Sequence, residues 1–282
     1  MKIKCIFIDI DGTLVKESGY LSDSVSSENL ESLKDYCSSG GKIVLATGRD
    51  ISTTLPIVKQ ITQIVDASCI PYLICMNGSF IYNSDGTQIL VRKSFDPEIP
   101  KNFAQIANKS RLNFFLVNSK REIFFTNKPF SWLIYLLLFR KRYPRKRYSE
   151  DMDFSNIQKA MIFLKLPRVA YWRSKLVPMF KECYFSSGPK CFLELVDRRI
   201  NKWYAAKEVL SFLGIRVEES AAFGNEGNDL LSLENAAFGV GFDLKEKTHL
   251  SWDDSKIQFH TTNEDCCGVS RAIKNMKNRG LY

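Results

Sequence analysis

The sequence predicts an α/β fold with a parallel sheet, interrupted by an inserted α+β domain. Short apolar segments alternate with helical patterns near both ends of the 282-residue chain, which is the rhythm of a parallel sheet. From residue 80 to residue 195, hairpin patterns replace this rhythm. The same stretch holds 21 Lys and Arg against 9 Asp and Glu, whereas the rest of the chain is slightly acidic. We therefore expect a core domain of residues 1–79 and 196–282, and a basic domain of residues 80–195.

The first part of the predicted core holds three strands and two helices. Each strand is a short run of apolar residues that ends in a turn signal. The first helix places Leu30 and Leu33 on one face and stops at Gly40-Gly41, and Pro56 limits the first turn of the second helix. We expect the strands at Lys2–Ile10, Lys42–Ala46 and Tyr72–Met76, and the helices at Ser26–Ser38 and Ser52–Gln63.

The insert and the second part of the core differ in the order of their predicted helices and strands. In the insert, Asp85-Gly86 is a turn between two short strands, and a helix and further strands follow. After the insert, helices and apolar strands alternate again. Within the insert we expect strands at Ser79–Tyr82, Ile89–Arg92, Phe114–Val117, Glu122–Thr126 and Met161–Leu166, and a helix at Pro97–Ser110. Beyond it we expect helices at Asn201–Leu213 and Asp229–Ala236, and strands at Ser220–Phe223 and Ala237–Gly241.

Apolar runs and cysteine spacing indicate the cellular compartment of the protein. The longest apolar run, Phe130–Phe139, is too short for a membrane span, which needs roughly 20 residues. The amino-terminal segment carries carboxylates and lacks a small-residue cleavage site. The eight cysteines are scattered and form no C-x-x-C pair, which favours reduced thiols. We therefore expect a cytoplasmic protein with no membrane partner.

The positive charge raises the question of nucleic-acid binding. The chain carries a net charge of +9, and six of the eight residues of Arg140–Arg147 are basic. Such a run is more often an exposed loop than a nucleic-acid contact. We expect no nucleic-acid partner.

Polar clusters follow four of the predicted core strands. They are Asp9–Thr13, Thr47–Arg49, Asn77-Gly78 and Gly224–Asp229. In open α/β sheets, ligands bind beyond the carboxyl ends of the strands. The four clusters are therefore expected to converge on one crevice.

The first cluster points to a metal ion. Asp9 and Asp11 stand two residues apart, so on an extended chain their side chains point to the same face. Two close carboxylates repel each other unless they share a cation or a proton, and oxygen ligands suit Mg²⁺. Gly12 permits a sharp turn after the strand. A calcium loop would need a Glu at its twelfth position, which is absent.

Taken in order, these clusters resemble the motifs of the haloacid dehalogenase superfamily, and more closely those of its Cof-type (subclass IIB) phosphatases. Asp9–Thr13 resembles the first motif, DxDGT, and Thr47–Arg49 resembles the second. Lys202 and Gly224–Asp229 resemble the third and fourth motifs, and Asn77-Gly78 resembles the entrance to the cap. The resemblance implies a Rossmann-like core with a parallel sheet, plus an inserted α+β cap domain that determines substrate specificity.

The resemblance also implies a Mg²⁺-dependent phosphomonoester hydrolase. Asp9 would attack the phosphoryl group of a small phosphorylated metabolite, with a sugar phosphate favoured, and form an aspartyl-phosphate. Asp11 would serve as general acid and then as general base. The expected phosphate-binding residues are Thr47, Gly48, Lys202 and Asn228, and the expected Mg²⁺ ligands are Asp9, Asp11, Asn225 and Asp229.

Two positions depart from the family pattern. Asn225 stands where a metal-binding Asp is usual, which predicts weaker Mg²⁺ affinity, and Trp203 stands where Gly is usual, which predicts a narrower pocket. Arg49 is interpreted as a structural ion-pair residue and left out of the catalytic set. Two alternatives stay open: a phosphomutase of the same superfamily, and a catalytically impaired binding protein, which Asn225 suggests.

Overall fold

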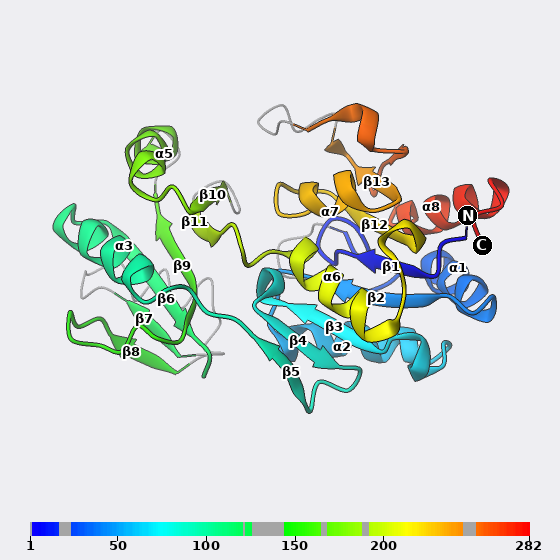
Figure 1. Cartoon of the computed structure of the whole chain (residues 1–282), viewed down its shortest axis with the longest axis horizontal. Helices are drawn as coiled ribbons and strands as arrows, with labels where there is room; N and C mark the ends of the chain where they lie inside the picture. The colour runs from blue at the N-terminus through cyan, green and yellow to red at the C-terminus, as the bar shows by residue number, and fades with distance from the viewer. Residues whose placement is uncertain are drawn as a thin grey trace. The chain divides into compact units, whose positions relative to one another are not determined.

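The computed structural model describes residues 2–16, 24–120, 122–125, 144–164, 168–187, 192–244 and 252–282. These residues form two compact units, which can be followed along the coloured chain in Figure 1. Unit 1 comprises Met1–Arg92 and Asn201–Tyr282, and unit 2 comprises Lys93–Ile200. The apolar run Phe130–Phe139 and the first four residues of the basic run lie outside the described residues.

Unit 1 is built on an eight-stranded sheet of order β14-β13-β12-β1-β2-β3-β4-β5. The strands from β14 to β3 pair in parallel, and β4 and β5 continue the sheet antiparallel. The parallel strands are β1 (Cys5–Ile8), β2 (Lys42–Ala46), β3 (Tyr72–Cys75), β12 (Ser220–Gly224), β13 (Phe238–Phe242) and β14 (Phe259–Thr261). The predicted parallel core is confirmed.

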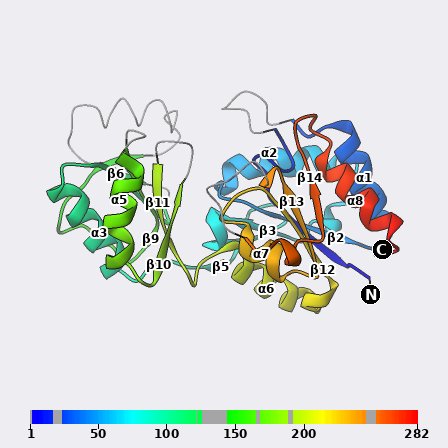
Figure 2. The ribbon, with the colours of Figure 1, turned by 90° about the horizontal axis from the view of Figure 1, so that it is seen from above.

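Helices cover both faces of this sheet, as Figure 2 shows. On one face lie α1 (Ser27–Ser38), α2 (Ile51–Thr62) and α8 (Gly268–Asn278), and on the other lie α6 (Lys202–Leu213) and α7 (Leu230–Asn235). In β1, Ile6 and Ile8 are buried on the first face, and Cys5 and Phe7 on the second. Burial on both faces explains the unbroken apolar sequence of this strand. Among the described residues, none of the helices has the length and apolar character that a membrane span requires.

The hairpin of β4 (Phe80–Asn83) and β5 (Ile89–Arg92) belongs to unit 1. We expected this hairpin to open the insert, with boundaries after residues 79 and 195, but the structure divides the chain after Arg92 and Ile200. The reason is that β4 pairs with β3 and buries Phe80 and Ile81 in the core clusters. Without the hairpin, β3 would be an unprotected edge strand.

Unit 2 is an α+β unit on a six-stranded sheet of order β10-β11-β9-β6-β7-β8. Two helices, α3 (Glu98–Lys109) and α5 (Val169–Leu176), contribute to a single apolar cluster with this sheet. The strands are β6 (Asn113–Asn118), β7 (Ile123–Phe125), β8 (Arg145–Arg147), β9 (Ile157–Phe163), β10 (Cys183–Ser187) and β11 (Phe192–Asp197).

Several elements differ from the expectations. β8 corrects the loop expected at Arg140–Arg147: its three basic residues are exposed, but they pair with β7 in parallel. β1 is shorter than the expected Lys2–Ile10. The side chain of Asp50 caps α2, so the helix begins at Ile51. Pro56 therefore lies in the middle of the helix and not in its first turn, as we had expected. The elements α5, β10, β11, β14 and α8 were not predicted.

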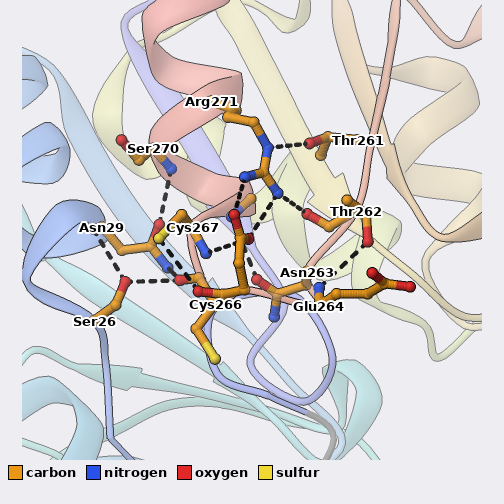
Figure 3. A network of polar contacts seen from close by, with 12 residues as sticks. Ser26, Asn29, Thr261, Thr262, Asn263, Glu264, Cys266, Cys267, Ser270 and Arg271 are labelled. Atoms are coloured by element: carbon orange, nitrogen blue, oxygen red, sulfur yellow. Dashed lines mark hydrogen bonds and ion pairs between the residues drawn. The ribbon is translucent and has the colours of Figure 1, made fainter.

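A buried asparagine joins α1, the loop after β1 and the start of α8 (Figure 3). Asn29 is fully buried, and its Nδ2 donates to the carbonyl oxygens of Leu14 at 3.2 Å and Cys266 at 2.8 Å. Its Oδ1 accepts from the backbone N of Ser270 at 2.8 Å. The side-chain Nδ2 of Asn263 donates to the carbonyl oxygen of Val15, the residue after Leu14, at 3.1 Å. Side-chain amides therefore fix the backbone that follows the first polar cluster.

We expect Asn29→Ala to lower the free energy of unfolding by about 3 kcal/mol, because the buried carbonyl oxygen of Leu14 and the buried backbone N of Ser270 lose this partner. Asn235→Ala is a matched control: this exposed side chain donates only to Leu231 O in its own helix, and the change should stay within about 0.5 kcal/mol. Urea unfolding followed by circular dichroism measures both. Equal stability of the two variants would contradict the role given to Asn29.

Candidate active site

The centre of the site is a buried lysine at the start of α6. Lys202 is 1% exposed, and its Nζ donates to Oδ1 of Asp9 at 2.5 Å and to Oδ1 of Asp229 at 2.7 Å. Asp9 follows β1 and Asp229 follows β12, which are neighbours in the sheet. The helix begins at Lys202 because the side chain of Asn201 caps it, accepting from Tyr204 N at 3.0 Å. Three separate segments thus meet at one ammonium group.

Burial and ion pairing oppose each other in this triad. Burial raises the pKa of Asp9, the Lys202 ammonium opposes the rise, and the negative charge of Asp229 adds to it, so that the net direction is upward. Burial alone would lower the pKa of Lys202, but the carboxylates of Asp229 and Asp9 outweigh it and raise that pKa. Lys202 is therefore protonated, and its charge is the main influence that favours the carboxylate form of Asp9.

Asp11 lies in a different environment from Asp9. Its side chain is 53% exposed, against 8% for Asp9, and both of its oxygens accept from Arg49, from Nε at 2.9 Å and Nη2 at 2.6 Å. The two carboxylates thus differ in exposure and in partner, although the charge of Asp11 still acts on Asp9 and adds to the rise of its pKa. The difference arises because β1 ends at Ile8 and the chain turns at Gly12, whose φ is 76°. Arg49 forms an ion pair, as expected, and its partner is Asp11.

Gly12 also allows the loop after β12 to come close. A Cβ at Gly12 would overlap the side-chain amide of Asn225, so another residue would push the two loops apart. Asn225 is 2% exposed, and its Oδ1 has no hydrogen-bond partner among the described residues. A buried carbonyl oxygen without a donor calls for an unobserved partner, and it is a suitable ligand for a hard cation.

The other expected metal ligands fit a Mg²⁺ ion only in part. Oδ1 of Asp9 accepts a hydrogen bond from Lys202, and no described residue donates to its Oδ2. Asp229 differs from the expectation: its Oδ1 faces Lys202, and its Oδ2 accepts from the backbone N of Asn225 and of Glu226, each at 3.0 Å. Asp229 therefore orients Lys202 and the loop after β12 instead of facing a metal. No group of three or more His, Cys, Asp or Glu able to hold a metal ion occurs within the described ranges.

Three of the four expected phosphate-binding residues, Thr47, Gly48 and Asn228, lie around Asn77, and the fourth, Lys202, pairs with Asp9 and Asp229. Thr47 is fully buried, its Oγ1 accepts from Arg49 N at 3.1 Å, and its carbonyl oxygen accepts from Asn77 N at 3.0 Å. Asn77 Oδ1 accepts from Asn228 Nδ2 at 2.9 Å, and a Cβ on Gly48 would lie 3.1 Å from the same atom. Asn77 was missing from the expected set. The signal was its place before Gly78 at a strand end, since Asn tolerates the left-handed conformation seen here, with φ 55°.

Trp203 does not narrow the pocket as expected. The residue is 7% exposed and belongs to the apolar cluster that α6 forms with the sheet, together with Phe7 and Val44. Its ring fills the core beside α6.

Comparison with known proteins now identifies the family. The family model of haloacid dehalogenase-like hydrolases matches residues 6–273. A putative phosphatase of Bacillus subtilis, YxeH, is 25% identical over 276 residues, which cover 96% of this chain and 97% of that protein. The 5-amino-6-(5-phospho-D-ribitylamino)uracil phosphatase YcsE of the same organism is 24% identical over 283 residues, with coverage of 96% and 95%.

A solved structure agrees with this family in fold. The subclass IIB sugar phosphatase BT4131 is 24% identical and superposes with a TM-score of 0.76, covering 99% of this chain and 100% of that one. The chain belongs to the haloacid dehalogenase-like hydrolase family and is a phosphatase of its Cof-type group.

We expect Lys202→Met to lower the free energy of unfolding by about 3–5 kcal/mol near neutral pH, because two buried carboxylates lose the ammonium group that they share. Lys207→Met, on the exposed side of the same helix, removes a cation 4.2 Å from the Tyr204 ring and should cost less than about 1 kcal/mol. Urea unfolding of both variants measures the difference.

The loss in Lys202→Met should depend on pH. The pKa of Asp9 in the folded state lies above its unfolded value, raised from 3.8 to about 8 by burial, and removing the ammonium does not reverse this. Within that window the folded state binds more protons than the unfolded state, so stability rises as pH falls. Both proteins share this rise below about pH 8, so the deficit of the variant should be constant there. Above about pH 8 the deficit should grow, because Asp9 ionises in the folded wild type but stays protonated in the variant, which lacks the ammonium that lowers this pKa. A pH-independent loss would mean that the carboxylates are not the cause.

Proposed function

We propose that this phosphatase is a Mg²⁺-dependent phosphomonoester hydrolase with Asp9 as nucleophile, acting on the phosphate ester of a sugar or sugar alcohol. The observation that carries the proposal is the buried Lys202 between Asp9 and Asp229, at the carboxyl ends of β1 and β12. A protein that only binds a ligand has no need to keep a carboxylate buried against its own desolvation cost. A nucleophile that must be ionised and stripped of water has that need.

In the proposed reaction, a carboxylate oxygen of Asp9 attacks phosphorus while the bond from phosphorus to the leaving oxygen breaks. Lys202 favours the ionised form of Asp9 before the attack and balances charge on the phosphoryl oxygens during it. Asp11 gives a proton to the leaving oxygen and then takes one from the water that hydrolyses the acyl phosphate. The phosphoryl oxygens would be held by the Thr47 hydroxyl, the Gly48 amide and the Asn228 side chain.

Mg²⁺ would be held by Asp9, by the amide oxygen of Asn225 and by the backbone carbonyl of Asp11. When bound, the ion offsets the repulsion between the phosphoryl oxygens and the attacking carboxylate. The unpartnered Oδ1 of Asn225 supports this assignment. Because an amide replaces a carboxylate, the site carries one negative charge fewer than an aspartate would supply.

The substrate class is supported by two relatives and by charge. One relative is named for a phosphoribityl compound and another is a sugar phosphatase, so both names point to phosphate esters of polyhydroxy compounds. The basic stretch from residue 80 to residue 195 would favour a substrate with anionic groups beyond the phosphate. We propose that unit 2, as the cap, selects among such substrates.

Asp9→Asn should abolish phosphate release from sugar phosphates, from flavin mononucleotide and from p-nitrophenyl phosphate, because the amide cannot form the acyl phosphate. The direct test is to quench the wild type during turnover and reduce it with borohydride, which converts an aspartyl-phosphate into homoserine. Peptide mass spectrometry should then find homoserine at position 9 alone.

Product analysis with these phosphate esters distinguishes the proposed function from its alternatives. An isomerised sugar phosphate instead of free phosphate would identify a phosphomutase. Full activity of Asp9→Asn would exclude the acyl-phosphate route. Binding of sugar phosphates by the wild type without any release, at high Mg²⁺, would favour an impaired binding protein.

Asn225→Asp should tighten Mg²⁺ binding about tenfold, because it restores a charged ligand at a hard-cation site. The concentration of Mg²⁺ that gives half-maximal phosphate release should fall accordingly, and calorimetric titration with Mg²⁺ checks the change without turnover. Asn235→Asp is the matched control, since it adds the same charge at an exposed position of α7 that is assigned neither to the metal nor to the substrate. An unchanged Mg²⁺ dependence of Asn225→Asp would remove residue 225 from the metal site.

A further inference from the structure

Arg49 makes a contact that the proposed mechanism does not use. Its guanidinium donates from Nε and Nη2 to the two oxygens of Asp11, at 2.9 Å and 2.6 Å. A two-bond contact of this kind fixes both the position and the plane of a carboxylate. Asp11 needs such support, because its side chain is 53% exposed and stands on a turn beyond the end of β1.

Arg49 is itself anchored at three points of unit 1. Its backbone N donates to Thr47 Oγ1 at 3.1 Å, and its carbonyl oxygen accepts from Met76 N at 2.9 Å. Its Nη1 donates to the carbonyl oxygen of Thr53 at 3.3 Å, and its side chain is only 15% exposed. These contacts tie the guanidinium to the ends of β2 and β3 and to the first turn of α2. The orientation of Asp11 is therefore set by the sheet, although Asp11 lies outside it.

We propose that Arg49 is a positioning residue for the acid–base carboxylate Asp11, an inference that rests on the proposed function. When the bond between phosphorus and the leaving oxygen breaks and Asp9 bonds to phosphorus, the proton of Asp11 passes to the leaving oxygen. In the second half-reaction Asp11 takes a proton from water as the bond from Asp9 to phosphorus breaks. Arg49 exchanges no proton and forms no bond to phosphorus; it limits the directions in which a short, exposed carboxylate can point.

A comparison of leaving groups isolates this role. An alkyl phosphate, such as a sugar phosphate that the wild type hydrolyses, needs a proton on its leaving oxygen. An aryl phosphate, such as p-nitrophenyl phosphate, releases a stable phenolate without one. Arg49→Lys keeps the charge but loses the planar fork, so we expect kcat/KM for the sugar phosphate to fall about tenfold through misplacement of Asp11. For the aryl phosphate the fall should be less than about threefold, with KM nearly unchanged for both.

A double-mutant cycle then asks whether Arg49 acts through Asp11. In an Asp11→Asn background, adding Arg49→Lys should lower kcat/KM for the sugar phosphate by less than about twofold, because the group it positions is already disabled. Arg216→Lys is the matched control: it removes an Arg–Glu219 contact before the start of β12, at the opposite end of the sheet. Its kinetics should equal those of the wild type.

Two results would overturn the inference while leaving the proposed function intact. One is an equal loss on aryl and alkyl phosphates with a raised KM, which would make Arg49 a direct phosphate ligand. The other is a loss of full size in the Asp11→Asn background, which would make its role independent of Asp11. If the wild type releases no phosphate from any substrate, the proposed function is wrong and the inference falls with it.

Discussion

One ammonium group shared by two buried carboxylates is the constraint on which the core of this protein depends. Lys202 can give up its hydration only because Asp9 and Asp229 stand within hydrogen-bond distance, and the lysine in turn lowers the cost of burying each carboxylate. The chain must therefore bring the end of β1, the end of β12 and the start of α6 to one point. The side-chain cap of Asn201 and the close approach that Gly12 allows are the local means by which it does so.

The same edge of the sheet gives two neighbouring acids opposite surroundings. Asp9 is buried against a lysine, and Asp11 is exposed and bound to an arginine, although only Ile10 separates them. Acid–base and nucleophilic roles require carboxyl groups whose environments differ in this way. The turn at Gly12 produces the difference, because it takes Asp11 off the line of β1 and toward the end of β2, where Arg49 lies.

The parallel core and its polar edge could be predicted because apolar strands, helical patterns and turn residues are local signals. The short strand β14 and the strand β8 could not, because a run of three residues carries almost no periodicity. Sequence order also located Asp9, Thr47 and Lys202, but it could not say which partner each charged side chain selects. That choice depends on rotamers and burial, which is why the Asp11–Arg49 pair and the role of Asp229 emerged only from the structure.

The long separation between the partners of Lys202 has a consequence for synthesis. Asp9 and Lys202 are 193 residues apart, and β1 pairs with β12, so the middle of the core sheet cannot close until most of the chain has left the ribosome. Unit 2 is continuous in sequence and precedes those later partners. The sheet of unit 2 can therefore form before β12 is synthesised, when the edge of β1 that later pairs with β12 is still unpaired. The nascent protein therefore exposes one apolar edge of β1 until β12 has been made, and an unpaired strand edge of this kind favours aggregation.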